Sequence, residues 1–195
     1  MGKYDGYHTA YVAEQFKLPA LERADFPDGV AIRNDIMIGD LPNEFAKCDC
    51  LYSELPWRKG FYEFDKRAGI WGRDYSDFLA AVRRHIEAGN KPAVIVTGVH
   101  AVKRLAPHMI CETQLNGENM LALVWNMRVP VSGDTHRVLQ TLTENFDCIG
   151  DFCCGYGGTG MAARRAGKQF VMSDHNGSCI RYVADKLGPV EALAA

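Results

Sequence analysis

Residues 148–160 read Cys-Ile-Gly-Asp-Phe-Cys-Cys-Gly-Tyr-Gly-Gly-Thr-Gly, and this stretch decides the fold. Its first three residues form a short apolar run that predicts a buried strand, and the glycines predict a tight turn into a helix starting near Met161. Glycine lets a backbone approach a ligand closely, and a helix N-terminus offers free N–H groups. A second apolar run, residues 170–172, leads to Asp174, whose carboxylate can accept hydrogen bonds from ribose hydroxyls. This order of elements predicts a site for a nucleoside cofactor.

The rest of the chain alternates between short apolar runs and helical patterns. The runs predict strands at residues 36–38, 50–52 and 93–97, and the last has no alternation, so it should be buried on both faces. The apolar residues between Ser76 and Gly89 recur at helical spacing and predict a helix. Ser76 should cap its N-terminus, and Gly89 and Pro92 should end it. Two more such patterns follow, one over residues 138–146 and one after Asn176, which should cap it.

Two apolar stretches, residues 109–112 and 120–125, flank Asn116-Gly117, a dipeptide typical of β-hairpins. Residues 1–30 show no clear period and are interpreted as an irregular N-terminal arm, and the stretch from residue 58 to 73 is interpreted as a loop. Strands that alternate with helices predict a Rossmann-like α/β domain over residues 31–195. Its sheet should be doubly wound and mostly parallel, with the hairpin as an antiparallel edge.

The composition narrows the class of protein. The chain has 195 residues, of which 47% are hydrophobic and 24% charged, so it suits one globular domain. No apolar run is long enough for a membrane helix, and the first residues do not form a secretory signal. Seven cysteines without a Cys-x-x-Cys pair favour reduced thiols, a cytoplasmic location and no metal site. The net charge of −2 means that any affinity for nucleic acid requires a local basic patch.

The residues alone leave the cofactor open. A phosphate-binding loop would carry a lysine after its last glycine, and none follows Gly160. The segment from Gly155 to Gly160 satisfies the Gly-x-Gly-x-x-Gly pattern of dinucleotide-binding proteins, so a nicotinamide cofactor and an oxidoreductase activity remain possible at this point.

Residues 151–187 resemble the Asp-Pro-Phe-x-Gly-Ser-Gly-Thr-Thr-Gly segment, and its continuation, in the circularly permuted amino-methyltransferases. This family includes the DNA adenine-N6 and cytosine-N4 methyltransferases. Residues 172–176 are similar to the family's Gly-Ile-Asp-x-Asn, and residues 135–139 to its lead-in helix, with His136-Arg137 in place of Lys-Pro. The resemblance implies the permuted topology, S-adenosylmethionine as cofactor, and a set of cofactor-binding residues: Asp40, Asp151, Cys153, Gly155, Gly157, Thr159, Asp174 and His136.

A catalytic segment precedes the cofactor segment, as in the permuted members. The family's Asp/Asn/Ser-Pro-Pro-Tyr/Phe/Trp tetrapeptide is similar to Glu54-Leu55-Pro56-Trp57, with glutamate for the acid and leucine for the first proline. This likeness implies that Glu54 accepts a hydrogen bond from a base amino group, beside a backbone carbonyl of the Pro56 turn, while Trp57 stacks on the flipped base. In an alternative register, Ser53 is the acceptor.

The segment after the tetrapeptide interleaves aromatic and basic residues, which favours contact with nucleic acid. The residues expected to touch the substrate are Arg58, Lys59, Phe61 and Tyr62. Arg83-Arg84 and Lys103-Arg104 are interpreted as solvated faces. Only residues 126–134 separate the hairpin from the next helix, so no target-recognition insert fits there.

The function expected from the resemblance is methyl transfer to a base amino group, adenine N6 before cytosine N4. DNA is favoured over RNA as the substrate, and a homodimer is possible. One alternative is a cofactor-binding protein whose catalytic loop has decayed or been repurposed.

Overall fold

The computed structural model describes residues 18–56, 58–115, 117–128 and 131–188. In this part of the chain one nine-stranded sheet has the order β1-β2-β9-β8-β3-β4-β6-β5-β7. The strands are β1 (Arg23–Phe26), β2 (Gly29–Arg33), β3 (Cys50–Glu54), β4 (Ala93–Thr97), β5 (Met109–Leu115), β6 (Glu118–Trp125), β7 (Gly133–Asp134), β8 (Cys148–Asp151) and β9 (Gln169–Asp174). The central strands β2, β9, β8, β3 and β4 run parallel, whereas β1 and β6 pair antiparallel with their neighbours.

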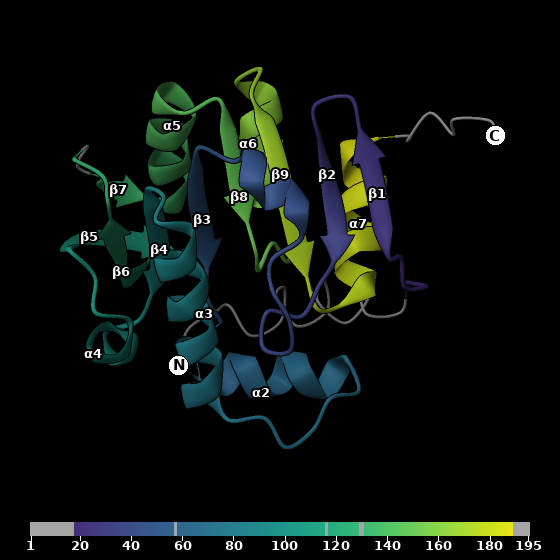
Figure 1. The fold of residues 1–195 in the computed structure, drawn as a ribbon, viewed down its shortest axis with the longest axis horizontal. Coiled ribbons are helices and arrows are strands. Elements are labelled where there is room, and N and C mark those ends of the chain that lie inside the picture. The colour runs from purple at the N-terminus through teal and green to yellow at the C-terminus, as the bar shows by residue number, and fades with distance from the viewer. Residues whose placement is uncertain (1–17, 57, 116, 129–130, 189–195) are drawn as a thin grey trace.

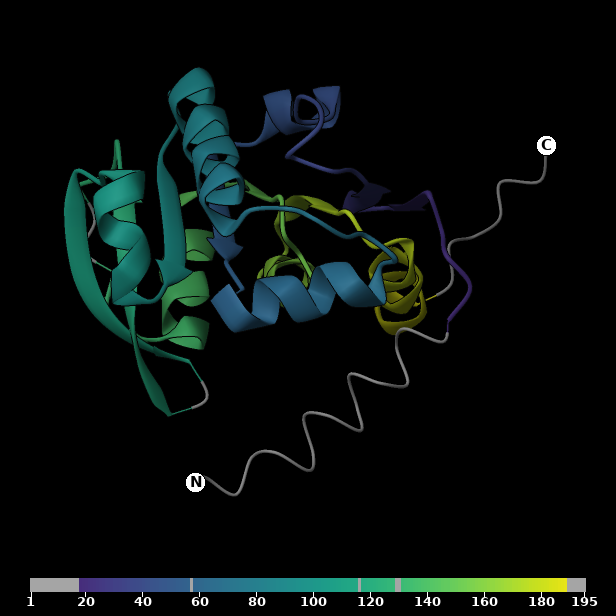
Figure 2. The same ribbon diagram turned by 90° about the horizontal axis from the view of Figure 1, so that it is seen from below.

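Helices cover both faces of the sheet, as Figures 1 and 2 show. The longer helices are α2 (Arg58–Arg67), α3 (Tyr75–Gly89), α5 (Thr135–Asn145), α6 (Gly158–Arg165) and α7 (Gly177–Leu187). The short ones are η1 (Asn43–Lys47), η2 (Val99–Ala101) and α4 (Val102–Leu105). The helices α3 and η1 pack on one face, where Phe45 and Val82 join Ile95 of β4 in one core cluster. The helices α5, α6 and α7 cover the other face. The predicted doubly wound arrangement is confirmed.

Most of the predicted elements are present. The strand β4 is buried on both faces, because Ile95 packs under α3 while Val94 and Val96 pack against α5. The hairpin of β5 and β6 forms around Gly117, whose φ of 82° lies in the left-handed region that glycine tolerates. Asn116 of the predicted turn lies outside the described residues.

Two helix caps can be compared with their predictions. Asn176 caps α7 as predicted, because its side chain accepts a hydrogen bond from the Ser178 N–H. The predicted cap of α3 is wrong by two residues, since Asp74 accepts from the Ser76 N–H, so Ser76 lies inside the first turn. This helix ends at Asn90, which adopts the left-handed conformation after Gly89.

The predicted strand at residues 36–38 is wrong. The Ile38 N–H donates to the Asp35 carbonyl and the Met37 N–H to the Asp35 side chain, so this segment is a turn. Ile36 enters the core whereas Ile38 is 80% exposed. The strand next to β9 at this side of the sheet is instead β2, which forms an antiparallel hairpin with β1. This hairpin begins inside residues 1–30, the segment interpreted as an irregular arm, and extends to Arg33. The four-residue β1 is too short to show an alternation in the sequence.

The segment interpreted as a loop contains α2. Its apolar face is narrow, because Phe61 is buried while four residues later the buried side chain is Asp65. Because Asp65 occupies an inward-facing position, the apolar residues of α2 do not recur at helical spacing in the sequence. The remainder of the segment, up to Arg73, leads into α3.

No helix in the described ranges combines the length and the apolar character that a membrane span requires.

We expect Gly150→Ala to destabilise the protein. A Cβ at this position in β8 would lie 2.9 Å from Phe45 Cδ1 and 3.0 Å from both Cys48 Sγ and Leu51 Cδ2. Overpacking of this kind costs roughly 1–3 kcal/mol of unfolding free energy, which urea denaturation would measure. Gly39→Ala is the matched control, because its Cβ would meet nothing within 4 Å. Equal stability of the two variants would contradict the packing described.

Candidate functional site

The carboxyl ends of β3, β8 and β9 bring the predicted acids to one edge of the sheet. Tyr52 of β3 pairs with Asp151 of β8, which pairs with Met172 of β9. Glu54 and Asp174 each lie two residues beyond this row on their own strands. Adjacent strands are about 4.8 Å apart, so the backbones of Glu54 and Asp174 are about 10 Å apart. The helix α2 crosses below this edge (Figures 1 and 2).

Asp151 fastens the glycine-rich loop to its neighbours. One carboxylate oxygen accepts from Ser53 Oγ at 2.7 Å and from the Cys153 N–H at 3.1 Å, and the other accepts from Thr159 Oγ1 at 2.6 Å. Burial raises the pKa of Asp151 to about 7, although these hydrogen bonds act in the opposite direction. Both oxygens are engaged within the protein, so Asp151 and Thr159 position the loop.

Asp174 connects the loop to the end of β9. Its carboxylate accepts from the Gly155 N–H at 3.0 Å and from the Asn176 N–H at 2.9 Å, and its side chain is almost fully buried. Gly155 has a φ of 46°, and a Cβ there would meet nothing within 4 Å, so the backbone at this point borders open space. Gly157 has a φ of 75° and packs where a Cβ would touch Val183. The loop therefore offers an uncovered backbone next to a fixed carboxylate.

Two side-chain amide nitrogens near Asp174 are buried without a hydrogen-bond partner in the described part of the chain. They are Asn34 Nδ2 and Asn176 Nδ2. The Asn34 N–H donates to the Asp174 carbonyl, which places Asn34 at the same strand end. Buried donors are normally paired, so two unpaired ones beside an open backbone suit a ligand with acceptor atoms. A nucleoside, with its ribose hydroxyls and ring nitrogens, meets this requirement.

Glu54 occupies the corresponding position on β3. Its Oε1 accepts a hydrogen bond from the Tyr52 hydroxyl at 2.6 Å. Burial raises the pKa of Glu54 above its ordinary value, and hydrogen bonds from Tyr52 and Thr135 partly offset this effect. Thr135 is the first residue of α5, so the positive end of that helix also lies beside the carboxyl group.

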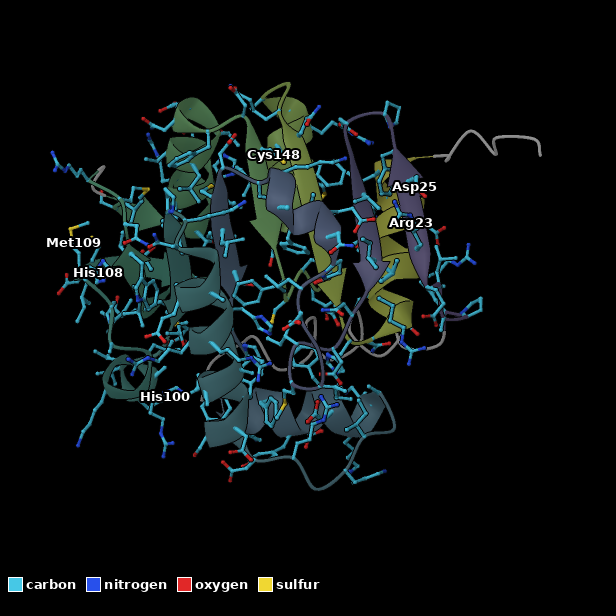
Figure 3. The ribbon with its side chains drawn as sticks, in the orientation of Figure 1. Arg23, Asp25, His100, His108, Met109 and Cys148 are labelled. Atoms are coloured by element: carbon cyan, nitrogen blue, oxygen red, sulfur yellow. The ribbon has the colours of Figure 1, made fainter. Side chains whose placement is uncertain are left out.

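The turn after Glu54 is held on both sides. The Leu55 N–H donates to the Val96 carbonyl at 2.9 Å, a bond that a proline at this position would lack. The Pro56 carbonyl accepts from the Tyr75 hydroxyl at 3.2 Å, and that hydroxyl lies 3.0 Å from His100 Nε2. Figure 3 places His100 at the same end of the molecule as α2, opposite Cys148 at the start of β8. No motif in the sequence marks Tyr75 or His100.

The structure corrects two predicted site residues. Ser53 is fully buried and engaged with Asp151 and the Cys153 N–H, so it is not free to accept a hydrogen bond from a substrate. Successive side chains of a strand point to opposite faces, which separates Ser53 from Glu54. Phe61 packs in the core against Tyr75 and Phe78 and is 3% exposed, so it has no free face for a base.

Other predicted residues lie in different surroundings. Asp40 is exposed, and the neighbouring Gly39 carbonyl accepts a hydrogen bond from Arg84 of α3. His136 is exposed on the first turn of α5. Lys59 is exposed on α2, and Tyr62 is 41% exposed and helps to line a cavity of about 190 Å³ with Lys66 and Trp71. Trp57 and the side chain of Arg58 lie outside the described residues.

A network that the sequence did not indicate ties α2 to the site. His175 lies between two carboxylates, with Nδ1 3.4 Å from Asp174 Oδ1 and Nε2 3.5 Å from Asp65 Oδ1. Arg73 pairs with Asp35, which follows β2. Burial raises the pKa of Asp65, whereas His175 and Arg73 lower it. No group of three or more His, Cys, Asp and Glu side chains in the described ranges is arranged to hold a metal ion.

The fold has solved counterparts. M1.HpyAVI superposes with a TM-score of 0.53 at 12% sequence identity, over 82% of this chain and 98% of that one. Its complex with S-adenosylmethionine gives the same TM-score at 10% identity, over 83% and 100% of the two chains. The chain has the fold of M1.HpyAVI. TTHA0409, a candidate DNA modification methylase of Thermus thermophilus, matches at 13% identity over 73% of this chain and 87% of that one, with a TM-score of 0.49. No family model and no curated protein matches the sequence.

We expect Asp151→Asn to change how stability depends on pH. The folded-state pKa of about 7 lies above the ordinary value of 3.8, so the folded protein retains a proton that the unfolded chain releases. The stabilising contribution is complete below about pH 4 and is lost as the pH rises to about 7. In denaturation experiments across this window, the free energy of unfolding of the wild type should therefore fall relative to that of Asp151→Asn. A wild-type free energy of unfolding that rises with pH relative to that of Asp151→Asn would contradict the raised pKa.

Proposed function

We propose that this protein binds S-adenosylmethionine at the carboxyl edge of β8 and β9 and transfers its methyl group to an exocyclic amino group of a nucleic-acid base. The observation that carries the proposal is that Glu54, the glycine-rich loop and Asp174 lie on three adjacent strands at one edge. The fold shared with M1.HpyAVI, which has been solved with S-adenosylmethionine bound, supports this choice of cofactor. The order of the segments, with β3 before β8, supports the circularly permuted arrangement.

The charges at this edge favour S-adenosylmethionine over a nicotinamide dinucleotide. Glu54 and Asp174 lie there beside Asp151, whose pKa is raised to about 7, and Asp65 is close behind them. The nearby arginines are engaged, since Arg73 pairs with Asp35 and Arg33 with Glu22. An acidic site attracts the sulfonium and ammonium groups of S-adenosylmethionine and repels the pyrophosphate of a dinucleotide.

The residues present can divide the work of binding. Asp174 would accept hydrogen bonds from the ribose hydroxyls, since its carboxylate can accept more than the two backbone N–H groups of Gly155 and Asn176. The uncovered backbone at Gly155 would lie along the cofactor, and the amides of Asn34 and Asn176 would donate to its acceptor atoms. Asp35, which interacts electrostatically with Cys153 of this loop, would be a further acid beside the cofactor, in addition to the proposed Asp40. When bound, S-adenosylmethionine supplies an electrophilic methyl group on sulfur.

Glu54 would orient the amine that receives the methyl group. A base amino group is a weak nucleophile because its lone pair is delocalised into the ring. A hydrogen bond to Glu54 favours a pyramidal nitrogen with its lone pair directed at the methyl carbon. The methyl group would be supplied by the bound cofactor, and the Glu54 carboxylate would stabilise the positive charge that the amine gains and would receive its proton.

DNA is the proposed polymer, with adenine N6 favoured over cytosine N4. Trp57 would stack on the flipped base, while Arg58, Lys59 and Tyr62 would contact the strand beside it. A second candidate is a cofactor-binding protein that transfers no methyl group. The contact between the Pro56 carbonyl and Tyr75 favours it, because this carbonyl is already engaged within the protein.

The first test is cofactor affinity. Asp174→Ala should weaken binding of S-adenosylmethionine by roughly 1.5–3 kcal/mol, the scale of hydrogen bonds to a charged acceptor, as measured by calorimetry. Asp185→Ala, which removes an exposed acid of α7, is the control and should bind as the wild type does. Unchanged heats for Asp174→Ala would remove its role in ribose binding. Preferential binding of NAD by the wild type would refute the assignment of the cofactor.

The second test is methyl transfer. Glu54→Ala should lower turnover by about 10²-fold or more and leave affinity for the cofactor nearly unchanged, because its hydrogen bond matters mainly during transfer. The measurement is incorporation of tritiated methyl groups into duplex DNA, single-stranded DNA and RNA. Glu118→Ala, at the exposed start of β6, is the control. If the wild type binds the cofactor but labels none of these polymers, the non-methylating candidate is correct.

A further inference from the structure

Two pairs of basic residues, distant in the sequence, line one cavity. Arg83 and Arg84 come from the middle of α3, and Lys103 and Arg104 from α4. Together with Ser76, Ala80 and Glu87 they enclose a volume of about 420 Å³. We call this cavity the α3–α4 groove. Interpreted separately from the sequence, each pair resembles an ordinary solvated face, and only the fold brings them together.

The groove carries an excess of positive charge. Four of its lining side chains are cationic and one is a carboxylate, Glu87, which pairs with Arg83 at 2.7 Å. The Arg84 guanidinium donates to the main-chain carbonyls of Ile36 and Gly39, which orient it without neutralising its charge. Lys103 and Arg104 are exposed and form no ion pair with any described residue. Asp74 lies near Arg104, but its side chain caps α3.

This positive region contrasts with the rest of the molecule. The net charge of the whole chain is −2, and the carboxyl edge of β3, β8 and β9 is acidic. The groove has four cations against Glu87 in its lining and Asp74 beside it, and this excess of positive charge makes it a local site for an anion. Three of its four cations are arginines, whose planar fork of donors fits phosphate oxygens in pairs.

The groove also lies close to the proposed catalytic turn. Tyr75, on the first turn of α3, holds the Pro56 carbonyl, and Arg83 lies about 12 Å further along the same helix at 1.5 Å per residue. The helix α4 follows β4, the neighbour of β3, and lies at the same end of the molecule as α2 (Figures 1 and 2). Ser76 lines the groove and follows Tyr75, so the groove extends to the end of α3 that contacts the turn after Glu54.

We propose that the α3–α4 groove binds the backbone phosphates of the nucleic acid on which the enzyme acts. This proposal rests on the proposed function for the choice of nucleic acid as the partner. The groove supplies the contacts that hold the strand in register, while the turn after Glu54 engages the base. It thus provides a phosphate-binding surface within the fold itself, where only residues 126–134 separate the hairpin from α5.

The test compares two double variants with the same change of net charge. Lys103→Ala with Arg104→Ala removes two cations of the groove. Lys47→Ala with Arg165→Ala removes two exposed cations that precede β3 and β9, at the opposite end of the sheet. Binding of a fluorescein-labelled DNA duplex is followed by anisotropy over a series of salt concentrations. Calorimetry with S-adenosylmethionine reports on the cofactor site of each variant separately.

We expect the groove variant to bind the duplex roughly tenfold more weakly. The slope of the logarithm of the association constant against the logarithm of the salt concentration should be smaller in magnitude by about 1.8 for this variant. This is about 0.9 for each of the two phosphates that the variant no longer neutralises. The control variant should match the wild type, and both should bind the cofactor normally.

Equal duplex affinity and salt dependence for the two variants would overturn the proposal. It would also be overturned if the wild type bound no nucleic acid, or if only a labelled polyglutamate peptide depended on Lys103 and Arg104. In each of these cases, calorimetry with S-adenosylmethionine still tests separately whether the protein binds the proposed cofactor.

Discussion

The buried carboxylate of Asp151 holds three parts of the chain in one place. It receives hydrogen bonds from Ser53 of β3, from the Cys153 backbone and from Thr159 of α6, so it joins two central strands to the loop and the helix that follow. Removing it would take the acceptor away from two buried hydroxyls, those of Ser53 and Thr159, each at a cost of roughly 1–3 kcal/mol. The position of the glycine-rich loop, and with it the Gly155 backbone beside Asp174, depends on this carboxylate.

Several acids are concentrated at one edge of the sheet, and each is stabilised differently. Asp174 accepts two backbone N–H groups, Glu54 accepts a tyrosine hydroxyl beside the start of α5, and Asp65 faces His175 and Arg73. Burial nevertheless raises the pKa of Glu54, Asp65 and Asp151, which means that the compensation is incomplete. A cationic ligand at this edge would lower the cost of keeping these groups ionised. Such a cost in the free protein is typical of functional sites.

Residues 54–57 differ from the tetrapeptide of the amino-methyltransferases that they resemble, and the structure shows how Leu55 is accommodated in place of the first proline. Leucine at position 55 extends the pairing of β3 with β4 by one hydrogen bond, and Tyr75 fixes the next carbonyl. The turn is therefore stiffened by hydrogen bonds instead of by a proline ring. The helix α2 that follows is tied back to the end of β9 through Asp65 and His175. These contacts link the proposed substrate side of the site to its cofactor side.

The sequence by itself determined the elements whose signals are local. The unit of β8, the glycine-rich loop, α6 and β9 was predicted correctly, as were the hairpin of β5 and β6 and the cap of α7, because positive φ angles, alternation and capping each depend on a few consecutive residues. The tertiary structure alone decided the rest. Ser53 hydrogen-bonds to Asp151, 98 residues away. The strands β1 and β2 complete the sheet through β9, and Arg83 meets Lys103 and Arg104 in one groove. Contacts between distant segments leave no periodic pattern in the sequence. A short strand such as β1, or a helix with an inward-facing acid such as α2, is stabilised mainly by packing against the rest of the protein.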